Sequence, residues 1–112
     1  MHRQRHIVRQ IDQYIAEHLS GDLSLTAIAD ALHFHPTYIS RVYRECSSVS
    51  FSDSIAQSRL KKACSLLSEI DQSIASIAEQ TGFNTANYFA RWFRKWMGCT
   101  AQEYRERSRD HA

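Results

Sequence analysis

The chain contains an internal repeat, and no other feature of the sequence constrains the fold as strongly. Residues 38–44 run Tyr-Ile-Ser-Arg-Val-Tyr-Arg and residues 88–94 run Tyr-Phe-Ala-Arg-Trp-Phe-Arg, so both follow the order aromatic, apolar, small, Arg, apolar, aromatic, Arg. An upstream pattern also recurs, in the pairs Leu25/Ile74, Ile28/Ile77, Ala29/Ala78, Leu32/Thr81 and Phe34/Phe83. The offset is 49 residues upstream and 50 downstream. Two copies of one unit are therefore predicted, the second with one extra residue in its turn.

Each copy is predicted to be two helices joined by a tight turn. Apolar spacings of three and four residues favour helices over 25–32 and 74–81, which Ser24 and Ser73 can cap. Second helices are expected over 36–46, with Pro36 at the first position, and over 87–95. Gly82 permits a left-handed turn residue between the helices of the second copy. This order is that of a helix-turn-helix unit.

Three further helices are expected around the two copies. An amphipathic helix over 2–19 ends at Gly21. A longer helix follows the cap formed by Ser50 and Asp53 and runs to about residue 69. Its buried stripe is expected to comprise Ile55, Leu60, Ala63, Leu66, Leu67 and Ile70. Thr100 and Glu103 have the spacing of a capping box for a last short helix, with Tyr104 packed inward and Arg105, Arg107 and Arg109 directed to solvent.

The resulting interpretation is an all-α chain organised as one compact module. Residues 1–50 form the first helix-turn-helix unit with its N-terminal helix, 51–70 a linker helix, and 71–112 the second unit with a C-terminal helix. Composition agrees, because 112 residues with 43% hydrophobic and 23% charged residues suit a small folded domain. Three glycines and one proline leave few turn signals for a sheet. The three cysteines lack CxxC spacing, and there is no signal peptide or membrane-length apolar run, so the cytoplasm is the expected location.

The second helix of each copy carries a free face, opposite the side assigned to the core. In the second copy Phe89, Trp92, Phe93 and Trp96 are assigned to the core, and the free face comprises Asn87, Ala90, Arg91 and Arg94. In the first copy Ile39, Val42, Tyr43 and Cys46 point inward, and the free face comprises Thr37, Ser40, Arg41 and Arg44. No acidic residue occurs within 31–44 or 80–102. Cations and hydrogen-bonding groups without carboxylates favour an anionic partner, and double-stranded DNA is the leading candidate.

Other function classes are weaker. A helical protein-interaction module, with arginines that bind acidic partner surfaces, predicts salt-sensitive protein binding without DNA sequence preference. An enzyme is disfavoured, because the sequence has no phosphate-cradling Gly-rich loop, no metal-ligand spacing and no nucleophile–base pair. His33 and His35 are interpreted as solvent-exposed residues around a buried Phe34, although His35 is also placed to touch a phosphate. No cofactor and no metal are expected.

Several motifs, in the right order and spacing, resemble the AraC/XylS family of bacterial transcription regulators. In the second half they are Ile77-Ala78, Gly82-Phe83, Tyr88-Phe89-x-Arg-x-Phe-Arg-Lys, Gly98-x-Thr and Glu103-Tyr-Arg. In the first half they are Leu23-Ser24-Leu25, Ile28-Ala29, Tyr38-Ile39-Ser40-Arg41 and Arg59-Leu60-x-x-Ala63. The resemblance covers nearly the whole chain and implies a seven-helix DNA-binding domain with two helix-turn-helix units on a central helix.

The resemblance also implies roles for individual residues and for partners. Two recognition helices would enter successive major grooves, with bases faced by Thr37, Ser40, Arg41, Ala86, Asn87, Ala90 and Arg91. Phosphates would be contacted by Arg44, Arg94 and Lys95. Members regulate transcription, so an activator is expected, with RNA polymerase as a second candidate partner and no membrane association. A chain of this kind is expected to be the C-terminal part of a longer regulator with an effector or receiver domain in front.

The chain departs from the family pattern at three positions. Ser48 stands where Gly is frequent, Ser54 where Tyr is frequent, and Ala101 where Pro often follows the threonine. A side chain at Ser48 is expected to strain its turn. The small side chain of Ser54 is expected to leave less aromatic packing beneath the linker helix.

Overall fold

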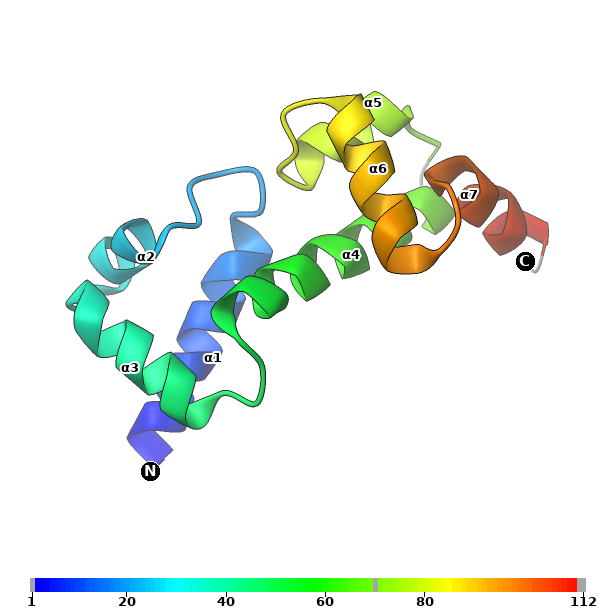
Figure 1. The fold of residues 1–112 in the computed structure, drawn as a ribbon. Helices are drawn as coiled ribbons and strands as arrows, with labels where there is room; N and C mark the ends of the chain where they lie inside the picture. The colour runs from blue at the N-terminus through cyan, green and yellow to red at the C-terminus, as the bar shows by residue number, and fades with distance from the viewer. Residues whose placement is uncertain (1, 70, 111–112) are drawn as a thin grey trace. The chain divides into compact units, whose positions relative to one another are not determined.

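The computed structural model describes residues 2–69 and 71–110, and these residues form seven α-helices and no strand (Figure 1). The helices are α1 His2–Glu17, α2 Leu25–Leu32, α3 Pro36–Cys46, α4 Phe51–Glu69, α5 Ile74–Gln80, α6 Ala86–Met97 and α7 Ala101–Asp110. The predicted all-α, seven-helix architecture is confirmed. The first helix ends at Glu17, two residues before its predicted end, and Gly21 closes the following turn by donating its N–H to the His18 carbonyl (2.9 Å).

The chain divides into two compact units, Met1–Ser58 and Arg59–Ala112, and the division falls within α4. The first unit therefore contains α1, α2, α3 and the start of α4. The second contains the rest of α4 with α5, α6 and α7. Ile70, assigned to the buried stripe of the linker helix, lies outside the described residues.

Serine caps begin the first helix of both helix-turn-helix units, as predicted. The hydroxyl oxygen of Ser24 accepts the N–H of Ala27 (3.2 Å), and that of Ser73 accepts the N–H of Ser76 (3.1 Å). Each hydroxyl satisfies one of the backbone donors that a helix start leaves unpaired, at a typical gain of about 1 kcal/mol.

The two tight turns share one backbone geometry. His33 has a φ of 63° and Gly82 a φ of 93°, so both lie in the left-handed region. In each turn the next residue is a phenylalanine, and its N–H donates to the carbonyl of an alanine in the preceding helix. Phe34 donates to Ala29 (2.8 Å) and Phe83 to Ala78 (2.9 Å). The left-handed residue was predicted at Gly82 alone, since histidine adopts this conformation far less readily than glycine.

Aliphatic residues of three helices form the core of the first unit. Ile11, Ile15, Ile28, Ile39 and Val42 are fully buried. Phe34 is only half-buried, so its predicted burial between the two exposed histidines is partial. Ser54, where the family often has tyrosine, instead donates its hydroxyl to the Asp12 carboxylate (3.3 Å), which also accepts the Tyr43 hydroxyl (2.8 Å). A polar junction therefore joins α1, α3 and α4.

Aromatic rings dominate the core of the second unit. Phe89 and Phe93 are fully buried, and the Phe83 ring lies 5.4 Å from that of Phe89 and 4.7 Å from that of Trp92. Trp96 was predicted to join this core, but 45% of it is exposed. It lies one helical turn beyond Trp92, and Trp92 is the last ring of α6 that contacts Phe83. The short helix α5 and its turn therefore do not cover Trp96.

The repeat extends further than the sequence comparison indicated, because α4 and α7 begin alike. The hydroxyl of Ser50 accepts the N–H of Asp53 (3.1 Å), and that of Thr100 accepts the N–H of Glu103 (3.0 Å). The Glu103 carboxylate in turn accepts the N–H of Thr100 (2.8 Å), which completes the predicted capping box and lowers the pKa of Glu103. Ser48, before this cap, has no left-handed φ, so the predicted strain there is wrong.

Arg105 was predicted to point to solvent, and this prediction is wrong, because the residue is buried. Its guanidinium donates to the backbone carbonyls of Leu67 (3.3 Å) and Gln72. A helix ends with unpaired carbonyls and a partial negative charge. The Arg105 guanidinium at the end of α4 provides hydrogen-bond donors for carbonyls there and a positive charge that balances the negative one. Tyr104 packs inward as predicted, with its ring 5.8 Å from that of Phe93.

Candidate nucleic-acid interface

The free face of α3 is solvent-exposed at its polar positions. Thr37, Arg41 and Arg44 are exposed, Ser40 is half-buried at the edge, and Ile39, Val42 and Tyr43 are buried on the opposite side. The Arg41 guanidinium lies 5.5 Å from the centre of the Tyr38 ring, which limits the orientations of the side chain. The helix starts at an unusual cap, since the His35 ring nitrogen Nδ1 accepts the N–H of Thr37 (3.2 Å).

The free face of α6 is more exposed, and Lys95 adds a third cation beside it. Asn87, Ala90 and Arg91 are exposed, as are the two cations assigned to phosphates, Arg94 and Lys95. Ala86, at the first turn, is half-buried. The hydroxyl of Thr85 caps this helix by accepting the N–H of Tyr88 (3.0 Å).

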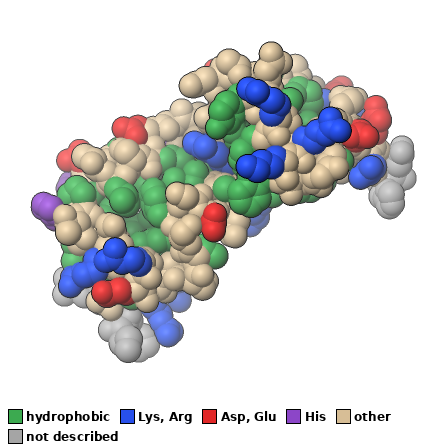
Figure 2. All heavy atoms as spheres, viewed as in Figure 1, with side chains coloured by type: hydrophobic (Ala, Val, Ile, Leu, Met, Phe, Trp, Pro, Cys, Tyr) green, Lys and Arg blue, Asp and Glu red, His purple; other side chains and the backbone are tan. Residues whose placement is uncertain are grey.

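Aromatic side chains line one flank of α6. Tyr88, Arg91, Trp92 and Lys95 surround a shallow hollow of 290 Å³ on this helix. Tyr88 is 57% exposed although its ring touches Phe83 (5.6 Å between centres). Figure 2 shows basic side chains over α6 with hydrophobic atoms between them. The sequence pattern assigned Arg91 and Lys95 to DNA but gave Tyr88 and Trp92 no function, because aromatic residues at helical spacing are the usual signature of a core.

Arg59, part of one of the sequence motifs but assigned no role in DNA binding, is a further basic residue of this unit. It is half-buried, its guanidinium lies 5.3 Å from the centre of the Phe83 ring, and burial lowers its pKa. Its Nε is buried without a hydrogen-bond partner among the described residues. A cation held against an aromatic ring beside α6 adds to the positive potential of this unit.

The charges of the two helices differ at one point only. α6 carries no carboxylate along its length, whereas α3 carries Glu45 near its C-terminal end, outside the free face. Both helices therefore present arginines at matching repeat positions, Arg41 with Arg91 and Arg44 with Arg94. Arginine offers several N–H donors in a planar fork, which suits base edges and phosphate oxygens.

Comparison with known proteins agrees with this geometry. Residues 28–107 match the family model described as a helix-turn-helix domain. The chain belongs to the AraC-type helix-turn-helix family of DNA-binding transcription regulators. Neither the family nor the fold is that of an enzyme. No helix in the described part of this AraC-type chain is long and apolar enough to cross a membrane.

Three similar proteins illustrate the relationship. Regulatory protein PocR of Salmonella typhimurium is 34% identical over 100 residues, which are 89% of this chain and 33% of PocR. The C-terminal domain of AraT, a response regulator from Geobacillus stearothermophilus, is 38% identical, with a TM-score of 0.79 over 89% of this chain and 84% of that one. A DNA-binding transcriptional dual regulator from Escherichia coli K-12 is 27% identical, with a TM-score of 0.83 over 93% of both chains.

The AraC-type chain is short beside its relatives. It spans 33%, 14% and 36% of the length of three curated regulators that it matches, from Salmonella typhimurium, Bacillus subtilis and Escherichia coli. These proteins therefore contain long segments that have no counterpart in the 112 residues.

Proposed function

We propose that the chain binds a specific double-stranded DNA site, with α3 and α6 each in a major groove and the two grooves successive on one face of the DNA. The observation that carries this proposal is the exposure of arginines at matching positions of both helices, with no carboxylate among the residues of either free face. α4 has 19 residues, about 28 Å at 1.5 Å per residue, which is comparable with the ~34 Å between grooves one turn apart.

In the first unit the base edges are faced by Thr37 and Arg41, with Ser40 at the margin of the face. Arg41 suits the O6 and N7 acceptors of guanine. Arg44 lies one turn further along α3 and meets the DNA backbone, which supplies affinity without sequence information.

In the second unit the base-facing residues are Asn87 and Arg91, with Ala86 and Ala90. Asn87 suits adenine, and the two alanine methyl groups suit the methyl group of thymine. Arg94 and Lys95, toward the end of α6, meet phosphates. Each good bidentate contact contributes about 1–3 kcal/mol of discrimination between bases.

The regulatory role is proposed as activation of transcription by a longer protein of which this chain is the C-terminal part. AraT supports this placement, because its similar segment is a C-terminal domain. RNA polymerase is the proposed second partner. A promoter–reporter assay with the intact regulator tests the direction, and a fall in transcription on binding would mean repression.

The test of DNA binding is selection of duplexes from a random pool, followed by footprinting at near-physiological salt. A site of about 20 base pairs with two blocks of sequence preference one helical turn apart is expected. Arg41→Ala should relax preference in one block and Arg91→Ala in the other. Lys95→Ala should weaken binding to all sequences and lower the salt slope by about one.

The rival is a module that binds acidic protein surfaces through the same arginines. It predicts that no duplex is enriched and that DNA binding is general and strongly weakened by salt. An equal loss on selected and random DNA for Arg91→Ala would remove this residue from the base-contacting set.

A further inference from the structure

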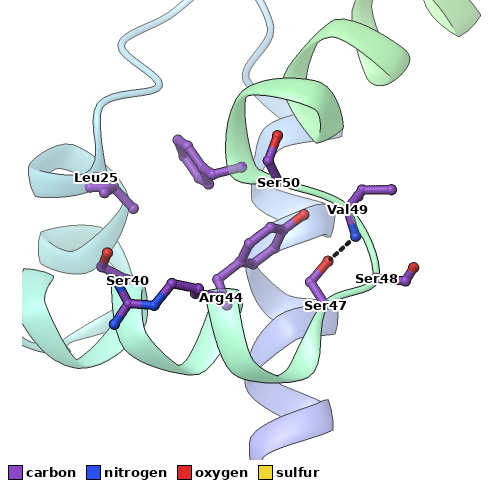
Figure 3. Close-up of a pocket in the computed structure, with 9 residues that line it drawn as sticks. Leu25, Ser40, Arg44, Ser47, Ser48, Val49 and Ser50 are labelled. Carbon is purple, nitrogen blue, oxygen red and sulfur yellow. Dashed lines mark hydrogen bonds between the residues drawn. The ribbon is translucent and has the colours of Figure 1, made fainter.

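The first unit contains a pocket that the family comparison does not explain. It has a volume of 420 Å³, is open to solvent, and lies between the start of α2, the second half of α3 and the loop into α4. Four serines, Arg44 and an apolar floor line it (Figure 3). Figure 3 shows the Arg44 side chain extended toward Ser40 and Leu25 across the pocket.

Several polar side chains of this pocket have hydrogen-bond donors that no other described residue uses. The side chains of Ser40, Arg44 and Ser48 make no hydrogen bond and no ion pair with other described residues. Ser50 uses its hydroxyl oxygen as an acceptor for the N–H of Asp53 (3.1 Å), so its O–H remains available to donate. Ser47 differs, because its oxygen accepts the N–H of Val49 (3.4 Å) and its hydroxyl is engaged with Tyr43.

No carboxylate lines the pocket. Glu45 and Asp53 are the nearest acids along the chain, and both are exposed outside the lining. The Asp12 carboxylate accepts the hydroxyl of Tyr43, which also lines the pocket (2.8 Å). The Arg44 cation and the serine hydroxyls that remain available fit an oxyanion with its three or four acceptor oxygens.

The size and floor of the pocket indicate which oxyanion. A volume of 420 Å³ exceeds the space that a lone phosphate group needs, and Leu25, Val49 and Phe51 add apolar surface. A phosphodiester within a nucleic-acid strand brings a deoxyribose on either side, and the C–H surface of the sugar suits apolar side chains. The donors and the floor together therefore match a sugar–phosphate unit.

We propose that this pocket binds one phosphate of the DNA backbone next to the groove entered by α3, through the Arg44 guanidinium and the hydroxyls of Ser40, Ser48 and Ser50. The proposal rests on the proposed function and reassigns Ser40 from a base to the backbone. Ser40→Ala is accordingly expected to weaken binding equally on all sequences, without changing the preferred bases.

The repeat provides a matched control in the same molecule. Arg94 occupies the position of Arg44 in the second unit, but Met97 and Gly98 follow it where Ser47 and Ser48 follow Arg44. Arg94 therefore lacks the serine loop, and its backbone contact is expected to be that of a single exposed cation.

The decisive experiment scans the selected duplex with single methylphosphonate substitutions, each of which removes one backbone charge. Wild-type chain is expected to lose about tenfold in affinity at one position beside the first block. Arg44→Ala and the double variant Ser40→Ala with Ser48→Ala should lose less than twofold at that position, whereas Arg94→Ala should keep the full tenfold loss. Unchanged circular dichroism and thermal midpoints establish that the variants are folded.

A second measurement uses the free chain with inorganic phosphate against chloride at equal ionic strength, followed by the NMR signal of the Arg44 side-chain N–H. Saturable binding in the millimolar range is expected, and it should disappear in the double serine variant. This measurement remains decisive even if the chain binds no specific DNA, which would overturn the proposed function separately.

Two results would overturn the proposal. If Arg44→Ala and the double serine variant keep the wild-type methylphosphonate profile while phosphate still binds, the pocket serves a free small anion and not the DNA backbone. If the profile is unchanged and phosphate does not bind, the pocket is no oxyanion site at all.

Discussion

The two helix-turn-helix units have one backbone plan but different cores. In the first unit the 16-residue α1 supplies Ile7, Ile11 and Ile15 to an aliphatic core. In the second unit the helix in the corresponding place is α4, which supplies Ala63, Leu66 and Leu67, and the large rings of Phe89 and Phe93 fill the centre. The paired helices α2 and α5 are similarly short, with eight and seven residues, so the difference lies in the side chains, and each aromatic side chain buries about 150–250 Å². The same turn can therefore be supported by quite different packing.

The two units also differ at one matching position of α4 and α7. Counting along the repeat, Ile55 near the start of α4 corresponds to Arg105 in α7. Ile55 packs against the aliphatic core, whereas Arg105 is buried and bonds two carbonyls. The second unit thus uses a buried cation where the first uses an apolar side chain.

The largest effects are expected from truncation of two fully buried side chains at matching positions, Ile39 and Phe89. Phe89→Ala should cost about 3–5 kcal/mol and Ile39→Ala about 2–5 kcal/mol of unfolding free energy. Both tryptophans lie in α6, so their fluorescence reports on the second unit, whereas circular dichroism reports on all helices. In urea, Phe89→Ala should lower the fluorescence midpoint, and Ile39→Ala mainly the dichroism midpoint. Coincident shifts in both variants would show that the two units unfold as one.

The next largest effect concerns the buried cation. Arg105→Ala should lower the unfolding free energy by about 2–3 kcal/mol, because the carbonyls of Leu67 and Gln72 lose a charged donor. Arg109, in the same helix, makes a surface ion pair with Asp71 (3.2 Å), and Arg109→Ala should cost no more than about 1 kcal/mol. Chemical unfolding followed by Trp fluorescence compares them. Equal losses would mean that Arg105 contributes only as a surface charge.

A smaller pair of effects, of opposite sign, is expected in the turns. Gly82→Ala should destabilise the second unit by about 1–2 kcal/mol, because a β-carbon is strained at its φ of 93°. His33→Gly relieves that strain in the first unit and should raise stability by less than about 1 kcal/mol, since glycine also has more freedom in the unfolded chain. Thermal unfolding of the two variants measures both signs. A destabilising His33→Gly would show that the imidazole makes a contribution beyond backbone geometry.

The smallest expected effect is a difference in sensitivity to alkali. Burial, together with Asp12, raises the pKa of Tyr43 above its ordinary value of 10.0, and Phe93 occupies the matching position in the second unit. A raised pKa gives stability that is complete below pH 10 and is lost as the pH rises through the folded-state pKa. Tyr43→Phe should lower the unfolding free energy by about 1 kcal/mol at neutral pH, because the hydrogen bond to Asp12 is lost. The stability of this variant should decline less steeply above pH 10 than that of the wild type.

Circular dichroism between pH 7 and 11.5 measures the difference between the two proteins. Tyr104 also has a raised pKa, so part of the alkaline decline should remain in the variant. Parallel curves for both proteins would show that Tyr43 does not cause the decline.

Much of the fold and the exposed faces was predictable, because these depend on local spacing. The seven helices, the serine caps and the exposure of Arg41, Arg91 and Asn87 follow from a period of 3.6 residues and from hydroxyls at helix starts. The errors arose where burial depends on a neighbouring element. Trp96 has the spacing of a core residue but extends beyond its cover, and Arg105 has the charge of a surface residue but finds two carbonyls.

The sequence by itself determined that the chain is helical, that it contains two related units, and that the second helix of each unit has a basic face without acids. These properties are periodic and local, so a linear pattern records them. Only the tertiary structure decided that His33 adopts a glycine-like turn, that Arg59 lies against the Phe83 ring, and that Ser40, Arg44 and the serine loop surround one pocket. The physical reason is that burial and donor convergence are set by side chains distant in the sequence, which packing alone brings together.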